Sequence, residues 1–437
     1  MDKNSSQDSF NPTIPTIMHI DLNSCFASVE QQANPLLRGK PVAVAAYTTG
    51  NGCILAPSVE AKRFGVKTGM RVRDGKALCP SLIILPSDPW KYRYINRKLL
   101  KLLKEYSSDI EIKSIDEMVV ILEHSPSLVK RNAYSHKEAL LSIGQEIKLR
   151  IKREVGDWLT VSIGFAPNRF LAKTAAGLNK PDGLDVIDKE NVEEVLFAMK
   201  LEDLCGIKQG NGGRLRLFGI TTTRAFYSAT AKELEMAFRS VVGYHWWMRL
   251  HGREIDDREF GRKSFGHSYA LYKPFAPKER ELHQILSQLV QKVGRRLRAG
   301  KYVARGMHVS CYFANHTYWH HGKKLPQPLF ANDDLYQAAK SVLTEAPNLP
   351  VRILTVSCFE LSPYLYDQQS IFSDETRKIN LTKALDAISD RWGDFIVTPG
   401  RMLGMGQKAL DRIAFGGVKG LEEFIFQEPI DTVSYAQ

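Results

Sequence analysis

Two adjacent acids, Asp116 and Glu117, lie inside an otherwise apolar and β-branched stretch of the chain, IEIKSIDEMVVILE at residues 110–123. Such a stretch predicts half-buried strands, and moving an unpaired carboxylate out of water costs several kcal/mol. The two side chains therefore need solvent at a turn, a basic partner or a metal ion. Taken alone, the stretch favours a hairpin tip at which both acids are simply solvated.

A third acid, Asp21, follows another apolar run, IMHIDLNS at residues 17–24. Adjacent strand residues point to opposite faces, so Asp116 and Glu117 can converge only where the chain turns or bulges, as a hairpin would allow. If the first strand lies beside that hairpin, three carboxylates gather at one sheet edge. Their oxygens suit Mg²⁺, and two such ions about 4 Å apart would activate an attacking hydroxyl and stabilise a leaving pyrophosphate.

The size and composition of the chain limit the classes of protein to which it can belong. Its 437 residues predict about three domains, and 43% hydrophobic residues are typical of a soluble protein. MVVIL, the longest apolar run near the acids, is far too short to span a membrane, and residues 1–14 are expected to be a flexible leader on a cytoplasmic protein. The six cysteines show no CxxC spacing, which argues against a zinc site or disulfides.

The positive charge of the chain is concentrated in one segment. The whole sequence carries +12, and residues 261–330 alone hold thirteen Lys or Arg against two acids. Tyr302, Tyr312 and Trp319 lie among these cations. A solubility-tuned surface would mix the two signs, so the segment indicates a polyanionic partner, most simply the phosphate backbone of a nucleic acid.

Around the acids, strand and helix patterns alternate from residue 14 to residue 188. The order strand, helix, two adjacent strands, helix, strand predicts a βαββαβ sheet with helices packed on one face, in an α+β fold. Residues 25–87 form an insertion after the first strand. Residues 189–256 are mostly helical, and residues 265–362 return to mixed helix and strand.

Three further stretches give the sequence a family resemblance. DLNSCFASVEQQANPLLRGKPVAV, SIDE and SIGFAPNRFLAKTAAGLNKPDG occur in this order, and the chain resembles the Y-family translesion DNA polymerases of the DinB/UmuC type from about residue 15 to about residue 410. The resemblance implies a monomeric enzyme that adds deoxynucleotides to a primer 3′ end, past damaged template bases. Its partners would be primer–template DNA and deoxynucleoside triphosphates.

The resemblance also implies a right-hand arrangement of domains with a ferredoxin-like palm. The expected parts are a palm at 15–24 and 88–188, fingers at 25–87, a helix-hairpin-helix thumb at 189–256, a linker at 257–264, a mixed α/β little finger at 265–364 and a tail at 365–437. The positive segment falls in the little finger, the domain with which this family grips DNA.

Carried onto this sequence, the family's metal-bridging aspartates are Asp21 and Asp116, and its third catalytic acid is Glu117. Leu22 is added to the expected metal site. The resemblance implies two Mg²⁺ ions, which Mn²⁺ can replace.

Phe26 lies where the family keeps an aromatic steric gate. A flat ring against the sugar C2′ leaves no room for a 2′-hydroxyl, so ribonucleotides are excluded by a clash. The alternative for Phe26 is a core aromatic of the helix SCFASVEQQ. The nucleotide site implied by the resemblance also includes Asn23, Cys25, Ser58, Lys62 and Lys180.

The fingers depart from the common pattern of the family. Many relatives carry a Tyr and an Arg that bind the β and γ phosphates, and here Val59 and Lys62 occupy those positions. Lysine supplies charge without the bidentate fork of arginine, and valine supplies no hydroxyl. Ser58 or Arg63 could compensate.

DNA contacts are expected from two regions. CGIKQGNGGRLRLFGI resembles a helix-hairpin-helix in which Gly206 and Lys208 would approach a phosphate, with Lys208 replacing the usual second glycine. In the positive segment the expected contacts are the basic residues Arg262, Lys263, Arg295, Arg296, Arg298, Lys301 and Arg305.

DQQSIFSDETRK, near the end of the chain, resembles the peptides by which bacterial polymerases bind the sliding clamp. Gln368, Ile371 and Phe372 would be its anchors, with the two apolar side chains filling a pocket.

Two other functions share parts of this pattern. A nucleotidyl cyclase has a similar palm with paired acids, but the basic domain and the thumb argue against it. A catalytically inactive adaptor of a mutagenic complex would not need Asp21, Asp116 and Glu117.

Overall fold

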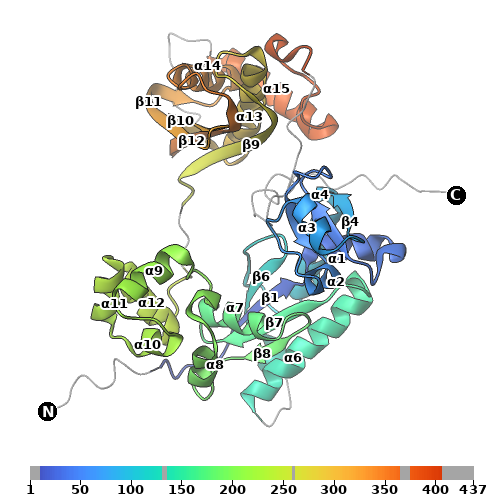
Figure 1. Ribbon diagram of the computed structural model, residues 1–437, viewed down its shortest axis with the longest axis vertical. Coiled ribbons are helices and arrows are strands. Elements are labelled where there is room, and N and C mark those ends of the chain that lie inside the picture. The colour runs from blue at the N-terminus through green and yellow to red at the C-terminus, as the bar shows by residue number, and fades with distance from the viewer. Residues whose placement is uncertain (1–9, 130–134, 258–260, 365–374, 406–437) are drawn as a thin grey trace. The chain divides into compact units, whose positions relative to one another are not determined.

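The computed structural model describes residues 10–129, 135–257, 261–364 and 375–405 (Figure 1). The chain divides into two compact units, with the boundary in the sequence near residue 260, and each is described by itself below. The first holds the expected palm, fingers and thumb, and the second holds the expected little finger with part of the tail. Within the described ranges, no helix has the length and apolar character needed to cross a membrane.

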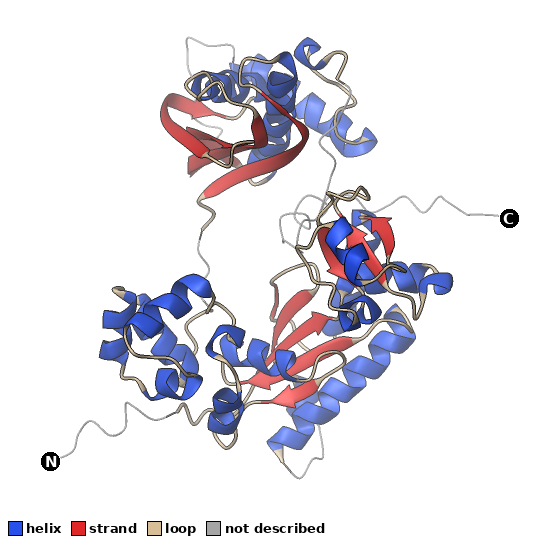
Figure 2. Ribbon diagram, viewed as in Figure 1, coloured by secondary structure: helices blue, strands red, loops and turns tan. Residues whose placement is uncertain are grey.

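The palm is a five-stranded sheet with the order β5-β6-β1-β7-β8. Strands are drawn red in Figure 2. β1 pairs antiparallel with both β6 and β7, and β8 pairs parallel with β7 at the edge. The strands are β1 (Ile17–Leu22), β5 (Ile110–Ile112), β6 (Glu117–Ile121), β7 (Val161–Ala166) and β8 (Leu184–Val186). The predicted α+β class and the ferredoxin-like strand order are confirmed.

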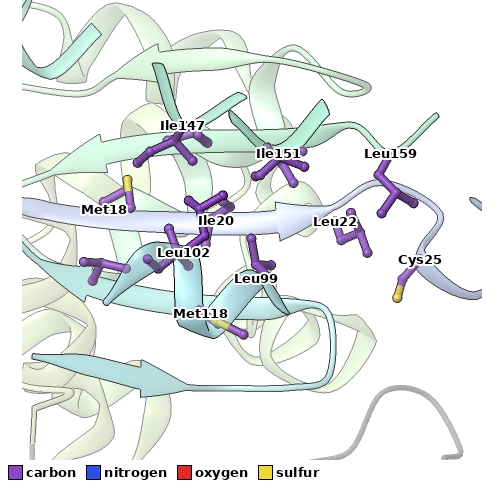
Figure 3. Close-up of a cluster of buried hydrophobic side chains, with 14 of the residues drawn as sticks. Met18, Ile20, Leu22, Cys25, Leu99, Leu102, Met118, Ile147, Ile151 and Leu159 are labelled. Atoms are coloured by element: carbon purple, nitrogen blue, oxygen red, sulfur yellow. The ribbon is translucent and has the colours of Figure 1, made fainter. Parts of the chain in front are cut away.

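One face of this sheet is covered by α4 (Pro89–Leu103) and α6 (His136–Arg150). Alternate residues of β1, Met18 and Ile20, are fully buried there against Leu99 and Ile147 (Figure 3). Asp88 is the N-cap residue of α4, and its side chain accepts from Trp90 N. α5 (Pro126–Val129) and the π-helical turn η2 (Ile151–Val155) flank α6.

The other face is covered by α7 (Arg169–Leu178). Gly164 of β7 lies directly under this helix, because a Cβ there would stand 2.1 Å from Ala176 N and 2.3 Å from Ala172 O. The two helices of the predicted βαββαβ unit, α4 and α6, share one face as expected, and α7 is a further helix on the opposite face. The periodicity of a helix shows which of its sides is apolar, but not which face of a sheet that side will cover.

The fingers are a small sheet with the order β3-β2-β4 and its own apolar core. Its elements are α1 (Cys25–Ala33), η1 (Pro35–Leu37), β2 (Val42–Ala45), β3 (Ile54–Pro57), α2 (Val59–Arg63), α3 (Val72–Leu78) and β4 (Ile83–Pro86). α1 leads directly from the palm strand β1 into this domain, so its first turn lies at the junction of the two.

The thumb is helical and packs around Trp246, Phe226 and Phe238. Its helices are α8 (Val192–Ala198), η3 (Leu201–Asp203), α9 (Gln209–Leu217), α10 (Thr223–Ser228), α11 (Ala231–Phe238) and α12 (Val242–Leu250). Asn11 N donates to the carbonyl oxygen of His251 at 2.8 Å, so this part of the segment expected to be a flexible leader lies against the thumb.

The second unit is a four-stranded antiparallel sheet with the order β11-β10-β12-β9. α13 and α14 bury one face of this sheet in a second core. The elements are β9 (Ser264–Phe275), α13 (Arg280–Ala299), β10 (Tyr302–Phe313), β11 (Tyr318–Leu329), α14 (Asn332–Leu343), β12 (Val351–Pro363), α15 (Glu375–Trp392) and η4 (Gly400–Met402).

Candidate active site

Asp21 of β1 and Glu117 of β6 are direct cross-strand partners in the palm sheet. One residue further along β1, the N–H group of Leu22 donates to the carbonyl oxygen of Asp116 at 2.9 Å. The end of the first strand therefore lies at the tip of the hairpin. The predicted convergence of the three acids at one sheet edge is observed.

The hairpin tip departs from regular pairing, as two adjacent converging acids require. The N–H groups of Lys113 and Ser114 both donate to the carbonyl oxygen of Glu117, at 3.0 and 3.1 Å. Ser114 Oγ accepts from Glu117 N at 3.0 Å and donates to the Asp116 carboxylate. Ser114 thus fixes the turn and one acid together.

Each of two acids is paired with a lysine. Lys180 Nζ lies 2.6 Å from Asp21 Oδ2, and Lys173 Nζ, from α7, lies 2.6 Å from Glu117 Oε2. Asp21, Asp116 and Glu117 are therefore held in place before any metal binds.

Burial sets the acidities of these three groups. It raises the pKa of Asp21 to about 6, against the opposing charge of Lys180. It also raises the pKa of Asp116, although the hydrogen bond from Ser114 acts in the other direction. Burial acts on Glu117 as well, but the hydrogen bond and charge of Lys173 outweigh it, so the pKa of Glu117 lies below its usual value. Crowded, desolvated acids of this kind favour a cation.

His19 is a neighbour that the sequence analysis missed. His19, Asp21 and Glu117 each offer one ligand atom, and these atoms lie within 4.8 Å of one another. Burial lowers the pKa of His19 to about 4, so its ring is neutral at pH 7. Neither of its ring nitrogens has a hydrogen-bond partner among the described residues. Strand alternation alone could have placed His19 on the face that carries Asp21.

A cavity of about 580 Å³ opens beside the acids. It lies between the end of β1, the start of α1 and the fingers segment around α2. Its lining includes Asp21, Leu22, Asn23, Ser24, Cys25, Phe26, Leu55, Ala56, Pro57, Val59, Lys62, Arg63, Thr68, Asp116, Lys180 and Pro181. All of the expected nucleotide-site residues except Ser58 therefore meet at one cavity.

Ser58 has a structural role instead. Its buried hydroxyl caps α2 by accepting from Ala61 N at 3.2 Å, and it also accepts from Val42 N at 3.2 Å. Ser58 is absent from the lining of the cavity, and its contact to the nucleotide stays a prediction. Arg63, the other residue expected to compensate for Val59, does line the cavity.

Two cavity residues are constrained by their surroundings. The side chain of Asn23 bridges neighbouring segments, because it donates to Ser162 Oγ and accepts from Asp182 N. Burial lowers the pKa of the Lys62 ammonium, and the charge of Lys180 acts in the same direction. The two lysines thus bring positive charge into a partly desolvated space.

In the second unit, three expected DNA contacts have other partners. Arg298 forms a two-point ion pair with Asp386 of α15, at 2.7 and 2.6 Å. Arg295 pairs with Asp390 and Asp394 of the same segment. Arg296 is buried and donates to the carbonyl oxygen of Gly266 at 3.2 Å. These three arginines attach the tail and the sheet to α13, and their contact to DNA stays a prediction.

Other cations of this unit remain exposed. Lys263, Lys301 and Arg305 have no ion-pair partner among the described residues. Arg262 lies over the ring of Phe265, with its guanidinium carbon 4.6 Å from the ring centre.

In the thumb, Gly206 has φ +92°, a conformation that favours glycine. Lys208 is the N-cap residue of α9, and its Nζ donates to the carbonyl oxygen of Glu202 at 2.8 Å. The expected clamp anchors Gln368, Ile371 and Phe372 lie outside the described residues.

Comparison with known proteins agrees with this geometry. The sequence model of the impB/mucB/samB family matches residues 20–177, and that of its C-terminal domain matches residues 262–371. A DNA polymerase IV of Pelotomaculum thermopropionicum is 31% identical over 86% of this chain and 93% of its own length. A DNA polymerase IV of Moorella thermoacetica is also 31% identical, over 87% of this chain and 94% of its own length.

Among solved structures, the "Y-family DNA polymerase chimera Dbh-Dpo4(243-245)-Dbh" is similar to this chain with a TM-score of 0.68. The match covers 79% of this chain and 98% of the chimera at 24% sequence identity. The likeness shows the fold of this chain.

A palm with three converging acids, joined to fingers, thumb and a separate basic domain, defines a right-hand nucleic-acid polymerase. The chain belongs to the impB/mucB/samB family of Y-family DNA polymerases, together with the DNA polymerase IV enzymes. It is a DNA-directed DNA polymerase of translesion synthesis, and its partners include DNA and deoxynucleoside triphosphates. Enzymes of this class use a divalent metal ion, and the carboxylate cluster provides suitable ligands. The predicted family and activity are confirmed, and neither the cyclase nor the adaptor alternative is favoured.

Proposed function

We propose that Asp21, Asp116 and Glu117 bind two Mg²⁺ ions, which Mn²⁺ can replace, with a main-chain contribution from Leu22. The observation that carries this proposal is the direct cross-strand pairing of Asp21 with Glu117 beside a cavity that Asp116 also lines. When bound, such ions activate the primer 3′-hydroxyl and stabilise the leaving pyrophosphate. The contacts of Ser114 to Asp116 and of Lys173 to Glu117, which fix these two acids, support the proposal.

The cavity is the proposed site of the incoming nucleotide. Lys62, Arg63 and Lys180 line it and supply the positive charge that a triphosphate needs. Val59 offers no hydroxyl, so in this chain charge takes a larger share of phosphate binding. Phe26 is the proposed steric gate against the 2′-hydroxyl, with Asn23 and Cys25 beside it.

DNA binding is proposed for the exposed cations of the second unit, Lys263, Lys301 and Arg305, with Arg262 beside them. Gly206 and Lys208 of the thumb are the proposed second contact to the backbone. The segment with Gln368, Ile371 and Phe372 is proposed, from its sequence alone, to bind a bacterial sliding clamp. We propose that the chain is active as a monomer.

Primer extension tests the metal assignment. With Mg²⁺ and all four deoxynucleotides, Asp116→Asn should lose at least about a thousandfold in extension rate, because a metal ligand is missing when charge develops. Its affinity for primer–template should stay within about twofold of wild type, because Asp116 is not one of the basic residues proposed to contact the DNA backbone. Extension at more than a tenth of the wild-type rate would refute the assignment.

A further inference from the structure

The ring of Phe26 stacks on the ring of Tyr92, a fully buried residue of α4. The two ring centres are 4.3 Å apart and the ring planes differ by 14°. Phe26 lines the cavity beside the acids, whereas Tyr92 is absent from its lining. Tyr92 therefore lies behind Phe26, as seen from the cavity.

The phenol of Tyr92 is fixed by two hydrogen bonds. Its hydroxyl donates to Glu30 Oε1 at 3.0 Å and accepts from the N–H group of Asp88 at 3.1 Å. Glu30 lies four residues after Phe26 on α1, so the two side chains project from the same side of that helix. Tyr92 thus contacts α1 at two points, the ring of Phe26 and the carboxylate of Glu30.

Glu30 is buried, and its second oxygen is paired with Lys91 Nζ at 2.7 Å. A buried carboxylate is unfavourable unless donors surround it, and Lys91 and Tyr92 supply those donors here. The pairing ties the position of α4 to the first turns of α1. A shift of the Tyr92 ring would break contacts to a buried charge, so the ring is a rigid support.

We propose that Tyr92, held by Glu30 and Asp88, is the positioning residue that keeps Phe26 in place against the sugar and so sets the rejection of ribonucleotides. The inference rests on the proposed role of Phe26 as the steric gate. A gate rejects a hydroxyl only if its ring cannot move back when the hydroxyl arrives. In a close-packed interior the space behind the ring is filled, and here Tyr92 fills it.

The test is a double-mutant cycle on full-length enzyme with primer–template. The quantity measured is kcat/KM for a deoxynucleotide divided by kcat/KM for the matching ribonucleotide. Tyr92→Leu should lower this ratio by about tenfold, the order that one unfilled apolar contact provides, chiefly by raising ribonucleotide incorporation. If Tyr92 acts through Phe26, the same change in a Phe26→Ala background should leave the ratio within about twofold.

Tyr106 supplies a matched control. It is another buried tyrosine, just beyond the end of α4, and its hydroxyl donates to Glu146 Oε1 at 2.6 Å. Tyr106→Leu should lower the melting temperature about as much as Tyr92→Leu while leaving the sugar ratio unchanged. If Tyr92→Leu does not fold, Tyr92→Phe takes its place in the test. This variant should lower the sugar ratio by about threefold, because the hydrogen bonds of the phenol hydroxyl are lost.

The outcomes separate the two levels of the proposal. An unchanged ratio in the Tyr92 variant would overturn the positioning role, as would an equal change in the Phe26→Ala background. An unchanged ratio in Phe26→Ala itself would instead overturn the steric gate. The ratio could also fall as much in Tyr106→Leu as in Tyr92→Leu. The effect would then come from a general loss of packing, and the inference would be refuted.

Discussion

Lys180 Nζ lies 2.6 Å from Asp21 Oδ2, so a cation of the protein occupies one side of an acid assigned to metal. Lys180 also lines the nucleotide cavity. The same ammonium can therefore neutralise Asp21 in the free enzyme and contact a triphosphate when a nucleotide enters. Lys173, which pairs with Glu117 in the same way, is absent from the cavity lining and has no such second contact.

The two lysines give a matched pair of variants. Lys180→Ala should raise KM for deoxynucleotides about tenfold, the loss expected for one charge-assisted contact to phosphate. Lys173→Ala should lower kcat through Glu117 but leave KM within about twofold. Steady-state kinetics of single-nucleotide insertion would measure both, and equal KM effects in the two variants would contradict the assignment.

The raised pKa of Asp21, about 6, predicts how stability depends on pH in EDTA. Above pH 6 the folded protein must hold an ionised, desolvated carboxylate, and this cost disappears as pH falls through 6 toward the ordinary aspartate value near 4. Asp21→Asn should therefore be more stable than wild type at pH 8 by on the order of 2 kcal/mol, with the difference shrinking toward pH 4. Denaturant unfolding at several pH values measures it, and a difference that grows on acidification would show the wrong sign.

The salt dependence of DNA affinity should differ between variants of exposed cations and variants of cations that are paired within the protein. Arg305→Ala should weaken binding and reduce the slope of log affinity against log salt by about 1, because one phosphate contact is lost. Arg295→Ala removes the same charge from a residue already paired with Asp390 and Asp394, and should leave the slope unchanged. Fluorescence anisotropy over a range of salt concentrations would show the contrast. Equal slopes for the two variants would contradict it.

Much of the palm could be predicted from local sequence. Strand alternation and the hairpin pattern predicted that Asp21, Asp116 and Glu117 converge. Both sequence patterns depend only on neighbouring residues, so they can be recognised locally. The side of the sheet that α7 covers could not be predicted, and Lys173 was missed with it. Gly164 allows α7 to approach β7 closely, but a single glycine in a strand does not predict such packing from the sequence.

Two kinds of contact within the fold were not predicted in the binding sites. Ser58 precedes a short helix, and an N-cap serine was readable from the sequence. The pairing of Arg295 and Arg298 depends on acids about 90 residues later in α15, and no local pattern reveals which charges will meet. Composition located the basic domain correctly, but could not say which cations the fold itself uses.

The clamp hypothesis has its own test. Deleting residues 368–372 should leave extension on bare primer–template within about twofold and remove stimulation by a bacterial sliding clamp, because the apolar anchors of such peptides carry most of their binding. An alanine substitution of Gln368 alone should have a partial effect. Full stimulation of the deleted enzyme would contradict the hypothesis.

Counting bound Mn²⁺ tests the central claim most directly. The measurement is electron paramagnetic resonance of the enzyme with a dideoxy-terminated primer–template and the next deoxynucleotide, so that no turnover is needed. The account predicts two ions per chain in wild type and fewer in Asp21→Asn, in Asp116→Asn and in Glu117→Gln. Two tightly bound ions in all three variants would contradict the assignment of these acids as the metal ligands.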